Sequence, residues 1–249
     1  MLLLAHRGDH RWAPENTLAA FAAALAIPGV DGLEVDVRAS ADGAAVVLHD
    51  ATLSRVQGRR LRASRLTVAE LADHGVPSLA AVLGACPPHA FLDVELKEDL
   101  GEVALAPLRA ARGRPDGSVT GVVISSFDHA ALATVRRLVP GWPCWLNTVW
   151  LSDRAIRSAV ALGCTGIAAE WHRIDTARAA RVRAAGLDLA AWTVRDAGAR
   201  DRLAALGVVA ACVEGAALPG QGSGSPAAPP AAINSSSPRR PSRSTHRRG

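Results

Sequence analysis

Charged side chains lie within two short apolar segments of the sequence, although strand interiors disfavour charge. Glu34 and Asp36 are two residues apart in the segment LEVDV, and Glu95 and Lys97 repeat this spacing in LDVELK. Because side chains alternate across a strand, each pair would lie on one face of its strand. Carboxylates are seldom buried unless they are paired or bind a metal ion. The two segments therefore predict a polar site rather than part of an apolar core.

Two histidines and a second cation complete this candidate site. His6 and Arg7 directly follow one apolar segment, and His49 follows another. Three carboxylates without a nearby cysteine suit a hard divalent cation, Mg²⁺ or Ca²⁺, better than zinc. Arg7 and Lys97 would offset the charge of an anionic substrate, and two histidines suit proton transfer to and from oxygen near neutral pH. Together these groups predict metal-assisted cleavage of a phosphodiester.

The order of elements that must position these groups follows from the hydropathy pattern. Short apolar runs alternate with longer amphipathic segments, as is typical of parallel strands joined by helices. Nine strands are predicted at 2–5, 32–37, 45–48, 91–96, 121–125, 144–149, 166–169, 187–193 and 210–213, and helices at 14–26, 128–138, 153–162, 175–185 and 197–206.

This alternation predicts a (β/α)₈ TIM barrel, in which the carboxyl ends of all strands converge on one mouth. The candidate site residues follow strands or end them, so the barrel would bring them together. An open doubly wound sheet is the competing fold. It is disfavoured because the chain has no glycine-rich dinucleotide loop after the first strand.

One of the nine strands does not belong to the ring of eight. Only residues 38–44 separate the second and third strands, too few for a crossover helix, and Asp42-Gly43 is typical of a two-residue hairpin turn. We therefore expect residues 45–48 to form an extra antiparallel hairpin strand beside the second barrel strand. A two-residue turn at Asp42 and Gly43 would place His49 opposite Asp36.

The chain has 249 residues and a formal net charge of +5. Residues 219–249 hold five arginines and no acidic residue, so residues 1–218 are neutral overall. We expect one barrel domain over 1–218 and a disordered Pro/Ser/Arg-rich tail over 219–249. A neutral domain does not predict a specific nucleic-acid partner. The first apolar run is too short for a signal peptide or a transmembrane segment, which predicts a cytoplasmic protein, and the four separated cysteines are expected to be reduced core residues.

Four motifs occur in the order found in a known family. AHRG at 5–8, PENT at 14–17, LEVDVRASADGAAVVLHD at 33–50 and DVELK at 93–97 resemble the signature blocks of the glycerophosphodiester phosphodiesterase family. VISSF at 123–127 and AWTVRD at 191–196 resemble later blocks. The resemblance implies a (β/α)₈ barrel and metal-dependent hydrolysis of glycerophosphodiesters to sn-glycerol 3-phosphate and an alcohol. In the route frequent in this family, a neighbouring hydroxyl of the substrate attacks phosphorus and gives a transient cyclic phosphate.

The resemblance also implies a role for each candidate residue. It assigns the divalent metal to Glu34, Asp36 and Glu95, acid–base catalysis to His6 and His49, the phosphate to Arg7 and Lys97, and the wall beside the glycerol moiety to Trp192. For Arg7 and Lys97 the structural alternative is ion pairing with the same carboxylates. For Trp192 the alternative is packing in the core.

Three segments leave the function partly open. The family closes its last strand with Thr-Asp followed shortly by Pro, where this chain has Val213-Glu214-Gly215, and Arg195 replaces a frequent Asn. Residues 50–78 are Arg-rich without an obvious hydrophobic block, which predicts a lid. The alternatives are a related phospholipase acting on lysophospholipid or phosphoinositide head groups, and a non-catalytic protein that binds metal and glycerol phosphate. The oligomeric state is not predicted.

Overall fold

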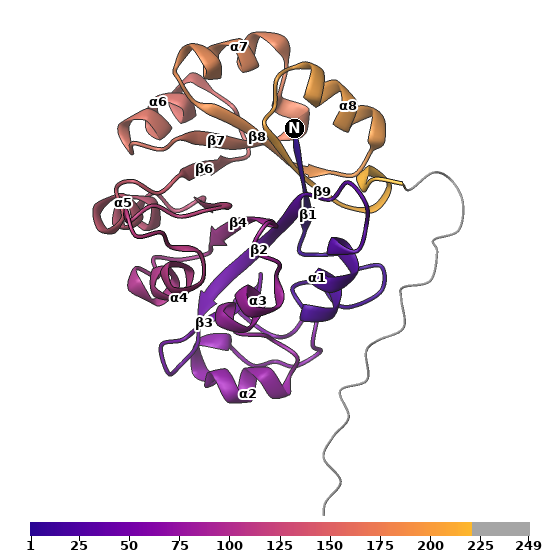
Figure 1. Ribbon diagram of the computed structural model, residues 1–249, viewed down its shortest axis with the longest axis vertical. Coiled ribbons are helices and arrows are strands. Elements are labelled where there is room, and N and C mark those ends of the chain that lie inside the picture. The colour runs from indigo at the N-terminus through magenta and orange to yellow at the C-terminus, as the bar shows by residue number, and fades with distance from the viewer. Residues whose placement is uncertain (221–249) are drawn as a thin grey trace, which may run out of the picture.

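The computed structural model describes residues 1–220, which form a closed parallel barrel surrounded by helices (Figure 1). The strands are β1 (Leu2–His6), β2 (Gly32–Ala39), β3 (Ala45–Val47), β4 (Phe91–Leu96), β5 (Val122–Ser126), β6 (Cys144–Thr148), β7 (Gly166–Glu170), β8 (Asp188–Val194) and β9 (Ala210–Val213). The order β1-β9-β8-β7-β6-β5-β4-β2 is closed by pairing of β1 with β2, and β3 lies outside this ring on β2. The predicted barrel with its extra strand is thus confirmed. Of the tail predicted over 219–249, residues 221–249 lie outside the described residues.

Most of the helices begin at a residue whose side chain caps the first turn. They are α1 (Leu18–Leu25), α2 (Val68–Asp73), α3 (Leu79–Ala85), α4 (Glu102–Arg112), α5 (His129–Leu138), α6 (Asp153–Ala161), α7 (Thr176–Ala184) and α8 (Ala197–Ala205), with short 3₁₀ helices at Ala63–Arg65, Trp171–Arg173 and Gly215–Ala217. A Ser, Thr or Asp side chain accepts a hydrogen bond from a backbone N–H at the start of every α-helix but α4. This N–H has no acceptor within the helix itself. Thr17 is the cap of α1, so this helix begins four residues later than Pro14, where the sequence predicted its start.

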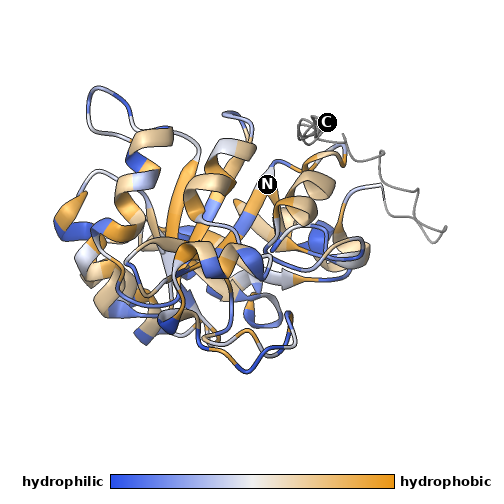
Figure 2. Cartoon of the chain, turned by 90° about the horizontal axis from the view of Figure 1, so that it is seen from below, coloured by the Kyte–Doolittle hydropathy of each residue, from blue (hydrophilic) through white to orange (hydrophobic). Residues whose placement is uncertain are grey.

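Side-chain alternation divides the strand residues between two environments. One set packs outward against the helices and forms the main core, and the other points into the barrel. In Figure 2 the apolar strands lie among the helices, and many polar segments lie in the outer turns. Inside the barrel the lower layer is apolar, with Leu4, Val123, Trp145, Ala168, Ala190 and Ala210. Two residues further along the strands the inward positions become polar, so the site rests on this apolar layer.

The pairing of β3 with β2 differs by one residue from the prediction. Val37 pairs with Val47, and the Leu48 N–H donates to the Asp36 carbonyl at 2.9 Å. Leu48, and not His49, therefore lies opposite Asp36.

The turn explains this difference, because its loop has three residues instead of two. The Ser40 N–H donates to the Ala44 carbonyl, and the Gly43 N–H donates to the Ser40 carbonyl. Gly43 takes the left-handed conformation, with φ of 74°, that a three-residue loop requires at its last position. Ser40 Oγ also accepts the Ala44 N–H at 2.9 Å, which stabilises the wider turn.

Residues 50–78 show no obvious hydrophobic block in the sequence, yet they contain buried apolar side chains; their role as a lid stays a prediction. Apolar residues spread among the arginines of this segment pack on β3 and form a separate small core. Its buried members are Val46, Leu48, Leu53, Ala63, Leu71 and Val76. The sequence pattern does not reveal this core because its buried members in the segment, Leu53, Ala63, Leu71 and Val76, are spread along the chain and form no continuous apolar run.

Two other expectations concern the cysteines and membranes. All four cysteines are free and buried, as predicted. Within residues 1–220, no helix has both the length and the apolar character needed to cross a bilayer.

Gly32 provides a test of the barrel packing. A Cβ at this position would lie 1.9 Å from the Phe91 carbonyl oxygen of β4. Gly32→Ala should therefore destabilise the protein by about 2 kcal/mol or more in urea unfolding, because overpacking of a core costs about 1–3 kcal/mol. Gly84→Ala in α3 is the matched control, since its Cβ would meet no atom within 4 Å, and it should stabilise by about 0.5–1 kcal/mol. Equal stability of the two variants would contradict this packing.

Candidate active site

The carboxyl ends of the strands enclose a cavity of about 180 Å³. Its lining comprises His6, Arg7, Glu34, His49, Asp93, Glu95, Lys97, Phe127, Asn147, Trp192, Thr193 and Cys212. Seven of the eight predicted site residues are in this set. The eighth, Asp36, is fully buried and contacts Arg7 and Lys97 at the wall of the cavity. The structure therefore brings together all the residues that the sequence singled out.

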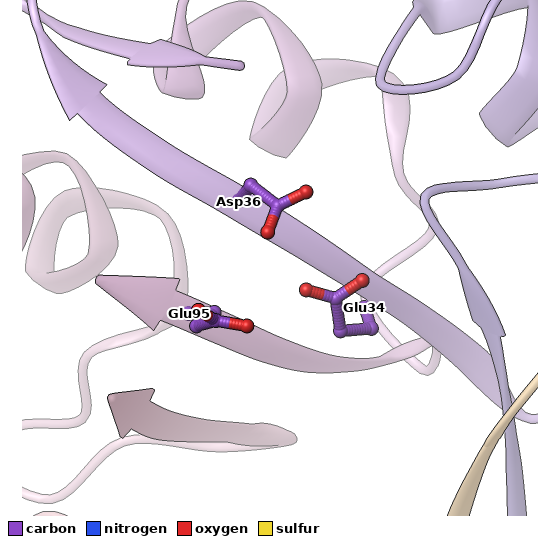
Figure 3. A group of neighbouring side chains, drawn as sticks. All are labelled: Glu34, Asp36 and Glu95. Carbon is purple, nitrogen blue, oxygen red and sulfur yellow. The ribbon is translucent and has the colours of Figure 1, made fainter. Parts of the chain in front are cut away.

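Three carboxylates from two neighbouring strands point into the same space. Glu34 and Asp36 come from β2 and Glu95 comes from β4 (Figure 3). Their spacing places each on the inner face, and the register pairs Asp36 with Glu95. One oxygen from each carboxylate lies within 4.8 Å of the other two. These residues can together hold a divalent metal ion.

Glu34 is the member of this cluster that most needs a cation. Both of its carboxylate oxygens are buried without a hydrogen-bond partner, and His6 Nε2 is 3.8 Å from Oε2. Burial, followed by the charges of Asp36 and Glu95, raises the pKa of Glu34 well above its ordinary value. A buried carboxylate without compensation is costly, so oxygen ligation of a cation would relieve it.

Cys212 corrects the expectation that no cysteine lies near the cluster. It lines the same cavity, and its Sγ is 3.8 Å from Asp93 Oδ2. Burial raises the pKa of the Cys212 thiol well above its ordinary value, which keeps it protonated. A protonated thiol is a poor metal ligand. The donor set therefore still favours a hard cation over zinc.

Asp36, in contrast to Glu34, is fully compensated. Arg7 Nε lies 3.0 Å from its Oδ2, Lys97 Nζ lies 2.8 Å from its Oδ1, and Asn16 Nδ2 donates to Oδ2 at 2.7 Å. Burial alone would raise the pKa of Asp36, but Lys97 and Arg7 outweigh it and lower the pKa to about 2. Arg7 and Lys97 thus make the ion pairs with a carboxylate that were the structural alternative to contact with phosphate. Both cations also line the cavity, as contact with a phosphate requires.

The loop before α1 adopts an unusual backbone that supports these contacts. Arg7 and Asn16 have positive φ angles of 59° and 57°. For a residue such as Arg this conformation costs about 1–2 kcal/mol. The Arg7 carbonyl accepts the Asn16 N–H at 3.0 Å, and both side chains then reach Asp36. Glu15 pairs with Arg7 and Arg55, so the PENT motif helps to position the cation Arg7.

Each histidine is held through Nδ1 by a carboxylate. His6 Nδ1 lies 2.9 Å from Glu214 Oε2, and His49 Nδ1 lies 2.7 Å from Asp50 Oδ1. Nε2 of each ring is therefore the nitrogen available to a substrate. Burial lowers the pKa of both histidines, which favours the neutral imidazole that can accept a proton.

His49 reaches the cavity despite the shifted register of the hairpin. β3 ends at Val47, and the chain then leaves the sheet. Arg38 Nε donates to the His49 carbonyl at 2.8 Å and fixes the backbone at this point. The position of the side chain is thus determined by the loop and not by strand pairing.

Other residues form an apolar and amide wall of the cavity. Trp192 is half-buried, its Nε1 donates to the Ala168 carbonyl at 3.0 Å, and the Phe127 ring packs edge-on against it at 5.4 Å. Asn147 is 7% exposed, and its Oδ1 is buried without a hydrogen-bond partner. The wall thus offers an aromatic surface and an unpaired acceptor to a ligand.

Sequence analysis assigned no site role to seven residues that line the cavity or contact its histidines: Asp50, Asp93, Phe127, Asn147, Thr193, Cys212 and Glu214. Asp93 could have been found, because it is two residues before Glu95 and therefore on the same inner face of β4. Asp50 directly follows His49, but adjacency in a loop does not indicate contact. Asn147 could have been found in the same way, because it is two residues after the inward Trp145 on β6. Glu214 contacts His6 only because the barrel closes, which the sequence does not reveal.

Comparison with known proteins gives a consistent result. The model of the Glycerophosphoryl diester phosphodiesterase family matches residues 6–216. A glycerophosphodiester phosphodiesterase from Caldanaerobacter subterraneus is 30% identical over 154 residues, 56% of this chain and 63% of that protein, so the match spans slightly less than two thirds of the relative. A Mycobacterium tuberculosis protein, probable glycerophosphodiester phosphodiesterase 1, is 42% identical over 201 residues, 66% of this chain and 70% of that protein. The structure of an Oleispira antarctica phosphodiesterase in complex with the product sn-glycerol-3-phosphate has a TM-score of 0.75 and 25% identity, and covers 86% of this chain and 92% of that one.

The unpartnered Glu34 generates a prediction about metal removal. In excess chelator and at a pH above the raised pKa of Glu34, Glu34→Gln should unfold at a higher denaturant concentration than the wild type, because it removes a buried uncompensated charge. With Mg²⁺ or Ca²⁺ at about 100 times its Kd, the wild type should gain about 2.7 kcal/mol, and the variant much less. Glu170→Gln at the end of β7, outside the cavity, is the control and should respond as the wild type does. An equal gain in stability of all three proteins on addition of the cation would contradict cation binding by this cluster.

Asp93 generates a prediction about pH. Burial raises the pKa of Asp93 from 3.8 to about 7, and the charge of Glu95 adds to this although Ser125 opposes it. A raised carboxyl pKa means that stability is complete below pH 3.8 and is lost as the pH rises through about 7. In chelator, Asp93→Asn should therefore exceed the wild type in stability by on the order of 3–4 kcal/mol at high pH, and much less in acid. Urea unfolding across this range measures the difference, and a difference that does not vary with pH would contradict the assignment.

Proposed function

The chain belongs to the glycerophosphoryl diester phosphodiesterase family, and from this premise we propose that it hydrolyses glycerophosphodiesters to sn-glycerol 3-phosphate and an alcohol. The observation that carries the proposal is the meeting of His6 and His49 with the cluster of Glu34, Asp36 and Glu95 in one cavity. Mutual positioning of acid, base and charge is what phosphodiester hydrolysis requires.

The three carboxylates would hold a divalent cation, Mg²⁺ or Ca²⁺. Their buried all-oxygen arrangement and the two orphan oxygens of Glu34 fit such an ion. When bound, the ion polarises a phosphoryl oxygen and offsets the negative charge of the substrate. Arg7 and Lys97 add positive charge at the same wall, where their ion pairs with Asp36 hold them in place.

The two histidines would move the protons. Each has Nδ1 occupied by a carboxylate, so Nε2 is the atom that exchanges a proton with substrate oxygens. One imidazole accepts the proton of the attacking oxygen, and the other donates a proton to the leaving oxygen. In the route through a neighbouring hydroxyl, that hydroxyl is the first attacking oxygen, so diesters without it should be poor substrates.

The size of the cavity supports recognition of the glycerol phosphate part. Its volume of about 180 Å³ is smaller than the ~300–1,000 Å³ of pockets that enclose drug-sized ligands. Trp192 covers one side of the glycerol moiety, and Asn147 Oδ1 accepts a hydrogen bond from a substrate hydroxyl in place of its missing partner. The leaving alcohol then extends out of the mouth.

A specific observation favours a second candidate, a phospholipase acting on lysophospholipid. Phe127, Val149 and Trp150 follow β5 and β6 at the mouth and are 45%, 45% and 61% exposed. Exposed apolar side chains in one region of a surface are typical of contact with an apolar ligand. Here they would contact the acyl chain of a lipid whose phosphate enters the cavity.

The decisive experiment measures release of glycerol phosphate from glycerophosphocholine, with added Mg²⁺ or Ca²⁺ and with chelator. His6→Ala and His49→Ala should each lower kcat by about 10²–10⁴-fold, because each removes a proton-transfer group. His172→Ala is the control, since this exposed histidine stacks on Trp171 outside the cavity.

Three outcomes separate the candidates. Failure of the wild type to exceed His6→Ala in metal-dependent release would refute the proposed hydrolysis. Metal-dependent binding of sn-glycerol 3-phosphate without turnover would identify the non-catalytic alternative. Faster release from lysophosphatidylcholine, lost selectively in Trp150→Ala, would favour the phospholipase.

A further inference from the structure

Two side chains that depart from the family pattern meet at the mouth of the barrel. Glu214 directly follows β9, and its Oε1 pairs with Arg195 Nε from the end of β8. Its other oxygen, Oε2, lies 2.9 Å from His6 Nδ1 and 3.1 Å from His10 Nε2. The side chain of Glu214 is only 12% exposed. The two departures are therefore one ion pair, and this pair holds a histidine of the proposed active site.

The charge state of Glu214 determines where His6 carries its proton. Burial alone would raise the pKa of Glu214, but hydrogen bonds from His10 and His6 outweigh it and lower the pKa. The ionised carboxylate accepts hydrogen bonds and cannot donate one. Neutral His6 must then carry its proton on Nδ1. Its Nε2 faces the cavity, 3.5 Å from Thr193 Oγ1 and 3.8 Å from Glu34 Oε2.

The same arrangement occurs at the second histidine. His49 Nδ1 lies 2.7 Å from Asp50 Oδ1, and Asp50 Oδ2 accepts a hydrogen bond from Arg55 Nε at 2.7 Å. Each imidazole thus contacts a carboxylate, and each of these carboxylates contacts an arginine. Two unrelated loops produce this order on the two flanks of one cavity, which indicates that the carboxylates orient the rings.

We propose that Glu214 is a positioning residue for His6: it holds the Nδ1–H tautomer with Nε2 directed into the cavity, and Arg195 holds Glu214 in place. A neutral histidine held in this tautomer always presents the lone pair of Nε2 to the substrate. The expected effect on catalysis rests on the proposed function. The expected tautomer does not.

The test compares Glu214→Gln, Glu214→Asp and Arg195→Met with the wild-type chain. Glutamine keeps the shape of glutamate but can donate as well as accept, so it removes the preference for one tautomer. Glu170→Gln is the matched control, because Glu170 Oε1 pairs with Nδ1 of the exposed His172, outside the cavity. Long-range ¹H–¹⁵N correlation spectra report the tautomer of each histidine, and the signal absent in His6→Asn identifies His6.

The wild type should show His6 protonated on Nδ1. Glu214→Gln should show a mixture of tautomers and a kcat for glycerophosphocholine lowered by about 10- to 100-fold or more, with KM within about threefold. Glu214→Asp, which keeps the charge, should recover part of kcat, and Arg195→Met should lose less than Glu214→Gln. The control should match the wild type in both measurements.

Two results would overturn the proposal. One is a wild-type His6 protonated on Nε2. The other is an unchanged His6 tautomer in Glu214→Gln, whether kcat stays the same or falls together with the thermal midpoint, since Glu214 would then act only on stability. If the wild type hydrolyses no glycerophosphodiester, the proposed function fails, and the spectra still decide whether Glu214 sets the tautomer.

Discussion

The concentration of negative charge at the carboxyl ends of β2 and β4 is the constraint on which the rest of the mouth depends. Strand alternation and the parallel register of β2 and β4 place Glu34, Asp36 and Glu95 on one inner surface. Like charges in a buried space repel one another, so each needs a partner of opposite charge. Asp36 obtains two from Arg7 and Lys97, whereas Glu34 pairs with no Arg or Lys among the described residues and has only the His6 ring, 3.8 Å away. The negative charge is thus compensated at Asp36 but not at its neighbour Glu34.

Much of the surrounding structure serves this charge balance. The positive φ of Arg7 and Asn16 costs conformational energy, and contacts of both side chains with Asp36 offset it. The inner barrel is apolar one layer below, which excludes water from the base of the cavity. Glu214 and Asp50 supply further carboxylates, but each is set on a histidine and backed by an arginine. Apart from Glu34, the carboxylates named here are therefore each paired with groups that can carry positive charge.

Sequence predicted those parts of the fold and site that depend on periodicity. The two-residue spacing of Glu34 and Asp36 predicted their common face, because alternation along a strand is fixed by backbone geometry, and the predicted barrel placed Glu95 at the same mouth. The hairpin register was wrong by one residue, because Ser40 stabilises a three-residue loop that a short turn motif does not reveal. Contacts between distant loops, such as Glu214 with His6, depend on the closure of the barrel and have no periodic signal. The roles assigned to the individual site residues stay predictions.

The location of the exposed aromatic residues has an evolutionary consequence. Phe127 and Trp150 belong to connections that follow β5 and β6, whereas the carboxylates of the cluster stand on β2 and β4, which come next in the ring. Under the proposed function, replacements in those connections would change which alcohols are accepted without altering the ion pairs of Asp36 or the strand pairing that closes the ring. Substrate choice and charge compensation would then depend on different positions, so that selection could change the first while the carboxylate cluster stays constant.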